Sequence, residues 1–414
     1  GVIAASGTLS QIIPPSLVLI ILADQLGRSI GDMYRGAIVP GFALTGLYIA
    51  YILVLAWLRP KTAPAIPEEA RTFNEPNGSR GTRSLGVLML ISVASAIAFG
   101  EIMLVENAPV DETIVVSILI WGLTAFVIAV INKVFRLGLL SQLAERVTFV
   151  MIPPLALIFL VLGTIFIGVA TPTEGGAMGA VGAIIMALAR KRLTLSLLKQ
   201  AMDTTTKLSC FVVFILVGST VFGLTFRGVN GDLWVEHLLI DLPGGQWGFL
   251  IFVSIFTFVL AFFLDFFELA FIIVPLLGPV ADKLGIDLIW FGVLLAVNMQ
   301  TSFMHPPFGF ALFYLRSVAP KEDYRDKVTG QMVAKVTTGQ IYWGSVPFIC
   351  IQLLMVALVM IFPGMVTHYK SDLPKVDPST VEINVDSAYG TGTYGGESDS
   401  GYGGYGDDAA DAFK

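Results

Sequence analysis

Apolar residues fill most of the chain in long runs that are separated by short polar connections. A helix needs about 20 consecutive apolar residues to cross a hydrocarbon core of roughly 30 Å. Runs of this kind predict membrane segments near residues 1–23, 38–58, 85–105, 113–131, 148–169, 173–189, 207–226, 247–264, 266–281, 289–315 and 341–362. The pattern therefore predicts an all-α polytopic membrane protein.

Two of these runs, 247–264 and 266–281, are separated by Asp265 alone. Two complete membrane spans cannot reverse direction within one residue. We therefore predict a re-entrant hairpin at about 247–281 that enters and leaves the membrane on the same side. Its tip must be covered by protein or line a water-filled cavity, because lipid cannot satisfy the backbone there.

Two other spans share one kind of interruption. Segments 10–17 and 302–309 both carry the pattern Ser-x-x-x-Pro-Pro, with the paired prolines Pro14, Pro15, Pro306 and Pro307. Downstream, residues 34–40 are echoed by 342–347. Loop charges place the two copies in opposite directions, which defines an inverted repeat with broken helices. Ordinary proline kinks are the alternative, but paired interruptions in inverted halves are typical of a transport site near the midplane.

Positive charge in the connections predicts the orientation of the chain. The connections richest in Lys and Arg are 59–84, 132–147, 190–207 and 316–335. Cytoplasmic loops carry this excess, so we expect a multi-pass protein of a bacterial inner (cytoplasmic) membrane with its C-terminal tail in the periplasm. The tail is acidic and rich in Gly and Tyr, a composition that predicts disorder.

These features predict a division of the chain into consecutive parts. They are the end of a first inverted repeat at 1–58, a cytoplasmic linker at 59–84, an inserted pair of spans at 85–131, a cytoplasmic amphipathic connection at 132–147, a second inverted repeat at 148–362 that contains the hairpin and the broken span 289–315, and a disordered tail at 363–414. Gly1 already lies inside an apolar helix with no charged segment before it, so we expect a fragment that lacks its N-terminal part.

Composition narrows the functional classes. The chain is 55% hydrophobic and 14% charged, with a mean hydropathy of +0.79, which excludes an ordinary soluble domain. It has no basic patch for nucleic acid. Cys210 and Cys350 lie in apolar runs and indicate neither a disulfide framework nor a metal site. The sequence has no phosphate-binding Gly-rich loop and no His-Glu-x-x-His motif, so it supports neither an ATP-driven pump nor a metalloenzyme, and we expect a protein that is not an enzyme and has no cofactor.

The interrupted spans supply candidate oxygen ligands for a cation. Each proline removes an N–H group and frees the carbonyl four residues earlier. The candidates are the residues that carry such carbonyls and the polar side chains beside them: Thr8, Ser10, Gln11, Asn298, Thr301, Ser302 and Phe303. Hard oxygen donors at membrane depth suit Na⁺ as a coupling ion. Alternatively, the hydroxyl groups bond only to their own backbone.

The hairpin tip and the breaks supply candidate substrate contacts: Asp265, Phe266, Phe267, Glu268, His305 and Ser16. Asp265 and Glu268 have the spacing of a helix-capping pair, and half-helix N-termini attract anions. Two acids would also repel a carboxylate unless they were paired, protonated or turned away. His305 is the leading proton-sensitive or substrate-contacting group, although it is equally suited to bonding a freed carbonyl. Thr171, Pro172 and Glu174 form a helix-start signal, for which we favour a structural role.

Several of these motifs together resemble one known family, the large permease subunit of TRAP (tripartite ATP-independent periplasmic) transporters. The matching features are the Gly-x-x-Thr-Pro-Thr-Glu turn at 168–174, the Phe-Leu-Asp tip at 263–265, the Leu-Gly-Ile-Asp turn at 284–287, Asn298 followed by Pro306-Pro307-x-Gly309, and the Pro-Pro-Ser break at 14–16. The resemblance covers most of the chain except 60–147 and the tail.

The resemblance implies an inverted-repeat, elevator-type carrier with two re-entrant hairpins that is driven by a Na⁺ gradient. A periplasmic substrate-binding protein would deliver an organic acid, and a small permease subunit would brace the scaffold. This chain departs from the family at the first hairpin, which is absent, and at Phe266, Phe267 and Glu268, which replace a Pro-Thr-Pro-like run. His305 replaces a usual Thr. We therefore hypothesise a bulkier or more aromatic acid than the familiar dicarboxylate.

Three other interpretations are open. The first is an ion-coupled carrier or antiporter of the same superfamily that works without a binding protein. The second is an intramembrane enzyme, which would need Asp265, Glu268 and His305 to converge around a substrate. The third is a structural membrane scaffold, in which the paired helix breaks would serve no purpose.

Overall fold

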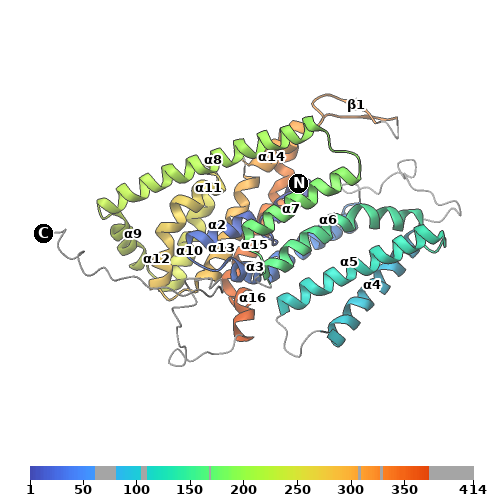
Figure 1. Cartoon of the computed structure of the whole chain (residues 1–414). Helices are drawn as coiled ribbons and strands as arrows, with labels where there is room; N and C mark the ends of the chain where they lie inside the picture. The colour runs from blue at the N-terminus through green and yellow to red at the C-terminus, as the bar shows by residue number, and fades with distance from the viewer. Residues whose placement is uncertain (61–80, 104–109, 167–168, 306–308, 327–329, 373–414) are drawn as a thin grey trace, which may run out of the picture. The chain divides into compact units, whose positions relative to one another are not determined.

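The computed structural model describes residues 1–60, 81–103, 110–166, 169–305, 309–326 and 330–372, and these residues are almost entirely helical (Figure 1). The first half contains α1 (Val2–Thr8), the 3₁₀-helix η1 (Leu9–Gln11), α2 (Leu17–Gln25), α3 (Ile30–Leu58), α4 (Thr82–Met103), α5 (Val110–Phe135), α6 (Gln142–Phe166) and α7 (Pro172–Ala189).

The second half begins with the longest helix of the described chain. Its elements are α8 (Leu195–Gly228), α9 (Gly231–Ile240), α10 (Gly245–Leu260), α11 (Phe266–Glu268), the π-helix η3 (Leu269–Ile273), α12 (Val274–Lys283), α13 (Leu288–Met299), the 3₁₀-helix η4 (Gln300–Met304), α14 (Phe310–Val318), β1 (Tyr324–Arg325), β2 (Met332–Val333), α15 (Thr338–Ile361), α16 (Gly364–Thr367) and the 3₁₀-helix η5 (His368–Asp372). Strands β1 and β2 pair antiparallel.

Long apolar helices occupy most of the segments that the hydropathy pattern predicted to cross the membrane. Within the described residues, seven helices are long and apolar enough to cross a membrane, namely α3, α4, α5, α6, α7, α8 and α15, and the bent pair α9–α10 raises the number to eight. The predicted segment 207–226 is shorter than α8. Charged residues near the start of α8 lower the local hydropathy there but do not end the helix. Thr194 caps α8 by accepting a hydrogen bond from the N–H of Leu197 at 3.2 Å. Helix α9 lies in a connection where no helix was predicted.

The two interrupted spans are confirmed as broken helices. Residues 1–23 form α1, η1 and α2, with the break at Pro14 and Pro15. The span 289–315 forms α13, η4 and α14, although Pro306 and Pro307 themselves lie outside the described residues. Helix α1 contacts α14, while α2 contacts α13. The first half of each span therefore lies beside the second half of the other, and the two spans run in opposite directions as the inverted repeat predicts.

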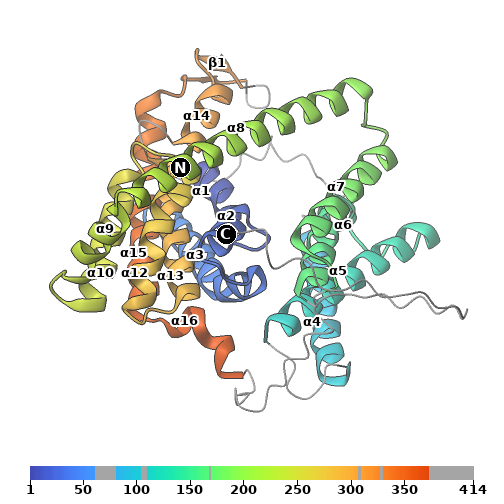
Figure 2. The ribbon, with the colours of Figure 1, turned by 60° about the vertical axis from the view of Figure 1, so that its left-hand side comes forward.

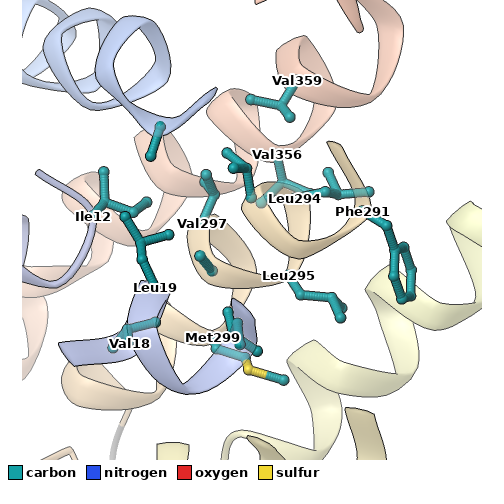
Figure 3. Packing of buried hydrophobic residues seen from close by; sticks show 14 of the residues in the cluster. Ile12, Val18, Leu19, Phe291, Leu294, Leu295, Val297, Met299, Val356 and Val359 are labelled. Carbon is teal, nitrogen blue, oxygen red and sulfur yellow. The ribbon is translucent and has the colours of Figure 1, made fainter. Parts of the chain in front are cut away.

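Helix α13 lies at the centre of the core, and all of its residues are buried. It contacts α2, α3, α10, α12 and α15 (Figure 2). Leu294 and Val297 pack among Ile12 and Leu19 of the first broken span and Val356 of α15 (Figure 3). A helix that is apolar on every side belongs in such a position. The second break is therefore held in place by neighbours from both halves of the chain.

Helices α4, α5 and α6 pack against one another around a separate small cluster of Leu88, Ala125 and Ile152. Helix α7 lies close against α6, since a Cβ atom at Gly182 would come within 2.4 Å of Leu157. The predicted capping box starts α7, where the Thr171 hydroxyl accepts from the N–H of Glu174 at 3.3 Å and the Glu174 carboxylate accepts from the N–H of Thr171 at 2.8 Å. Thr171 is thus the N-cap residue, and the helix begins at Pro172.

The predicted start of the disordered tail at 363 is wrong for its first residues. Helices α16 and η5 continue the fold to Asp372, and Val366 is completely buried against α3. Lys370 donates to the side chain of Asp287, which caps α13. Burial alone would raise the pKa of Asp287, but Lys370 and the N–H groups of Trp290 and Ile289 together lower that pKa below 3.8. Residues 373–414 lie outside the described residues.

Candidate functional site

The segment from α10 to α12 forms the predicted hairpin. Gln246, at the start of α10, donates its Nε2 to the carbonyl oxygen of Leu284, just beyond α12, at 2.5 Å. The two arms therefore meet at their base, and the turn at 261–265 lies at the far end. Lys283 at the end of α12 also forms an ion pair with Glu236 of α9 at 2.5 Å.

Asp265 and Glu268 form a reciprocal cap at the hairpin tip. The Oδ1 atom of Asp265 accepts from the N–H of Glu268 at 3.0 Å, and the Oε2 atom of Glu268 accepts from the N–H of Asp265 at 3.2 Å. Both N–H groups belong to the first turn of a helix, which offers them no partner of its own. The π-helix η3 follows directly. The capping role predicted for this pair is therefore present in the structure.

Ser16 forms hydrogen bonds to the residues on both sides of the first break. Its hydroxyl accepts from the N–H of Leu19 at 3.2 Å, which starts α2, and donates to the carbonyl oxygen of Gln11. That carbonyl is one of those freed by the prolines, so Ser16 already satisfies it. Ser16 is buried, and its own carbonyl oxygen accepts from the Tyr34 hydroxyl at 3.4 Å. In this structure Ser16 supports the break and is not among the residues that line the cavity described below.

The two breaks meet through a pair of buried polar side chains. Gln300 of η4 donates its Nε2 to the hydroxyl of Thr8, the last residue of α1, at 3.4 Å. Two positions earlier, Asn298 donates its Nδ2 to the carbonyl oxygen of Ser254 in α10 at 2.7 Å. Residues almost 300 positions apart in sequence therefore adjoin at the point where both helices are interrupted.

Two oxygen atoms at this junction have no partner among the described residues, namely Oδ1 of Asn298 and Oε1 of Gln300. Both side chains are about 1% exposed. A buried polar atom without a hydrogen bond is costly, on the order of 1–3 kcal/mol, and a water or an ion can satisfy it. Their amide groups each make one hydrogen bond, so the oxygen side remains available to a cation.

The candidate hydroxyl groups bond back to their own helices. The hydroxyls of three candidates donate to carbonyl oxygens three residues earlier, Thr8 to Ala5 at 2.9 Å, Ser10 to Gly7 at 2.9 Å and Thr301 to Asn298 at 2.6 Å. Such bonds are common for Ser and Thr in helices. They use the hydroxyl proton and leave the oxygen lone pairs to accept, as that of Thr8 does from Gln300.

His305 is packed between aromatic rings. It stacks on Phe262 with ring centroids 4.1 Å apart and meets Phe258 edge-on at 4.6 Å. The side chain is about 1% exposed. Neither ring nitrogen has a hydrogen-bond partner of normal geometry among the described residues, although the backbone of Ala261 lies close enough to interact with the ring. His305 therefore anchors the hairpin tip to the second break and does not line the cavity described next.

A cavity of about 240 Å³ lies where the hairpin tip meets the second broken span. Its lining combines aromatic walls with three polar side chains and consists of Phe211, Phe263, Leu264, Asp265, Glu268, Ser302, Phe310 and Phe313. The walls come from α8, the hairpin tip, η4 and α14. Cavities of similar volume lie elsewhere, but this cavity brings tip carboxylates together with a residue of the second break.

The structure separates the sequence candidates into two groups. Asp265, Glu268 and Ser302 line the cavity. Phe266 is buried and packs against Phe303 with ring centroids 6.4 Å apart, so it belongs to the core behind the cavity.

Phe267 faces Phe211 of α8 at 6.4 Å but is not among the lining residues. His305 and the tip acids do not converge on one cavity, which removes the geometry that an acid-base enzyme would need.

Sequence reasoning missed Gln300 and the phenylalanines of α8 and α14. Gln300 had a readable signal, because it is a polar residue between Asn298 and Thr301 in an otherwise apolar span. Phe211, Phe310 and Phe313 had none, since a phenylalanine in a membrane helix is ordinary. Their place in the cavity depends on how distant helices pack.

Comparison with known proteins shows an extended match to one family. The family model described as "Tripartite ATP-independent periplasmic transporter, DctM component" matches residues 1–365. The C4-dicarboxylate TRAP transporter large permease protein DctM of Rhodobacter capsulatus is 25% identical over 76% of this chain and 58% of its own length. The isethionate TRAP transporter permease protein DctMQ of Oleidesulfovibrio alaskensis is 24% identical over 80% of this chain and 42% of its own length.

A shorter match is also informative. The sialic acid TRAP transporter permease protein SiaT of Haemophilus influenzae is 28% identical over 50% of this chain and 32% of its own length. The chain thus spans 58% of the Rhodobacter relative and smaller shares of the other two. The names of these three relatives give three different substrates, C4-dicarboxylate, isethionate and sialic acid.

Proposed function

The chain belongs to the DctM component family of tripartite ATP-independent periplasmic transporters, and from this premise we propose that it serves Na⁺-coupled uptake of an organic acid. It is a permease and not an enzyme. A periplasmic binding protein would deliver the acid, and a small permease subunit would brace the membrane scaffold. The alternative is an ion-coupled carrier of the same superfamily that works without a binding protein.

The observation that supports a carrier is the meeting of three helix interruptions. Thr8 before the first break contacts Gln300 before the second, and Ser302 of the same short helix shares a cavity with Asp265 of the hairpin tip. Interrupted helices expose backbone and side-chain polar groups at membrane depth, and this exposure is tolerated where it serves a cavity. In inverted-repeat carriers such regions hold the substrate and the coupling ion.

Ion coupling is supported by the chemistry of the junction. Na⁺ is a hard cation that prefers oxygen ligands, and here Oδ1 of Asn298 and Oε1 of Gln300 are buried without partners among the described residues. Freed carbonyls of the two breaks lie on the same segments. A Na⁺ ion coordinated by these oxygen atoms would link α1 to η4. It would thereby stabilise one arrangement of the two broken spans.

The test is uptake of labelled organic acids into proteoliposomes that contain the full-length permease, its small subunit and its binding protein. We expect uptake to require an inward Na⁺ gradient. Gln300→Leu should raise the Na⁺ concentration for half-maximal uptake at least tenfold, because it removes a ligand without changing side-chain volume greatly. Replacement of Pro306 and Pro307 by Ala should abolish gradient-dependent uptake.

Gln352→Leu is the matched control, because Gln352 is a buried glutamine of α15 outside the junction. It should leave the Na⁺ dependence unchanged. Uptake that is indifferent to Na⁺ would contradict ion coupling through this site. Uptake that needs Na⁺ but no binding protein would favour the alternative carrier.

A further inference from the structure

The walls of the cavity at the hairpin tip are mainly aromatic. Phe211 comes from α8, Phe263 from the turn after α10, and Phe310 and Phe313 from successive turns of α14. Such walls suit a substrate with a large apolar surface, because burial of that surface is the main source of affinity in an apolar pocket. Phe266 and Phe267, which the sequence suggested for this role, lie outside the lining.

The charged groups of the cavity are both acidic. Asp265 and Glu268 line it, and each commits one carboxylate oxygen to the cap while its other oxygen has no partner among the described residues. The described lining contains no Lys or Arg. A carboxylate placed beside the tip would therefore be repelled by like charge that no described lining residue offsets.

One polar group of the cavity is suited to a carboxylate. Ser302 is 6% exposed, lines the cavity, and has no hydrogen-bond partner among the described residues. A serine hydroxyl donates one hydrogen bond. It lies in η4, on the side of the cavity formed by the second break. A single carboxylate thus has a donor at Ser302, while a second carboxylate has no donor in the described lining.

We propose, building on the proposed function, that the substrate is a monocarboxylate with a bulky, ring-sized apolar body and not a dicarboxylate. Its carboxylate accepts a hydrogen bond from Ser302, and its apolar body lies against Phe263, Phe310 and Phe313. Asp265 and Glu268 reject a second negative charge. The cavity selects for one charge and for apolar surface together.

The test compares three acids that separate these two features. Benzoate and acetate differ by the ring, while benzoate and terephthalate differ by the second carboxylate. Affinities are measured from the thermal-unfolding shift of the purified full-length permease in Na⁺, which removes the selectivity of the binding protein from the result. We expect benzoate to bind at least tenfold more tightly than either of the other acids.

Variants of the lining then assign each preference. Glu268→Gln keeps the capping geometry and removes one charge, so it should reduce the preference for benzoate over terephthalate about tenfold. Phe313→Ala should reduce the preference for benzoate over acetate. Phe214→Ala is the control, because Phe214 lies one turn from Phe211 on α8, is 79% exposed and is not part of the lining. It should change neither ratio.

Equal or tighter binding of terephthalate, or equal binding of acetate and benzoate, would overturn the proposal. Uptake in proteoliposomes separates this failure from that of the proposed function. Na⁺-driven uptake of a dicarboxylate would refute the substrate class alone. The absence of Na⁺-driven uptake for every acid would refute the carrier mechanism on which it depends. Binding of none of the three acids would refute this cavity as the substrate site.

Discussion

Replacement of Asp265 by alanine should destabilise the hairpin tip by about 1 kcal/mol. The carboxylate of Asp265 caps the N–H of Glu268 at 3.0 Å, and loss of an N-cap oxygen typically costs about 0.5–2 kcal/mol. The reverse bond, from the N–H of Asp265 to Glu268 at 3.2 Å, remains possible in this variant. Both side chains are only partly buried, which keeps the expected loss near the middle of that range.

Two variants separate the cap from the charge. Asp265→Asn preserves a capping oxygen and should lose little stability, because Asn and Asp are nearly equal N-caps. Glu268→Gln likewise preserves the capping box. The double variant Asp265→Ala with Glu268→Ala should lose less than the sum of the single losses, since each single change already disturbs the same reciprocal pair.

Hydrogen exchange of the Glu268 amide measures this effect locally. A loss of about 1 kcal/mol corresponds to a roughly fivefold fall in protection of that amide. Amides of α13 should be unaffected and provide the internal reference. Equal loss of protection in Asp265→Asn and Asp265→Ala would refute the capping argument, because it would mean that the charge and not the hydrogen-bond geometry orders the tip.

Three further changes test other parts of the fold. Asn298→Ala should lower the free energy of unfolding by about 1 kcal/mol, measured by denaturation in detergent, because it removes the hydrogen bond to the Ser254 carbonyl of α10 while the loss of the unpartnered Oδ1 offsets part of the cost. Gly36→Leu should lower it by about 1–3 kcal/mol in the same assay, because a Cβ atom there comes within 2.9 Å of Val366 and displaces α16. Lys370→Ala should cost at most about 1 kcal/mol at pH 7, since the ion pair with Asp287 is partly exposed. The pKa of Asp287 is lowered in the folded state, so this difference should be full above pH 3.8 and disappear as the pH falls through the folded pKa.

Local signals in the sequence were enough to predict the hairpin and both breaks. Asp265 between two apolar runs requires a reversal, and paired prolines remove consecutive backbone donors. The direction of each span followed from loop charge, and the contacts of α1 with α14 and of α2 with α13 agree with it. These features depend on a few residues whose chemistry acts locally.

The same reasoning has a limit, which Pro153 and Pro154 illustrate. They form a third proline pair, yet α6 continues through them. Pro153 frees the carbonyl oxygen of Phe149, and Arg190, beyond the end of α7, donates to that oxygen at 2.5 Å. In α6, tertiary structure therefore supplies a partner for a carbonyl that the prolines free, and the helix continues. That partner lies 41 residues away, where no local pattern reveals it.

The cavity shows the same dependence on distant packing. Its acids and Ser302 were readable because polar groups are rare within apolar spans. Its aromatic walls were not, because Phe211 and Phe313 become neighbours of the tip only when α8 and α14 pack there. Sequence thus predicted the polar chemistry of the site and misassigned its apolar surface to Phe266 and Phe267.

One short segment connects every part of the candidate site. Asn298 reaches the hairpin arm α10, Gln300 reaches Thr8 of the first break, and Ser302 lines the cavity. An ion bound at Gln300 and an acid bound at Ser302 would therefore stabilise the same conformation of η4. Linkage is reciprocal: the factor by which Na⁺ raises the affinity for the acid must equal the factor by which the acid raises the affinity for Na⁺. Gln300→Leu should reduce this common factor toward one, measured as the binding constant of the acid with and without Na⁺. A factor as large as that of the unchanged protein would show that the ion and the acid are not coupled through this segment.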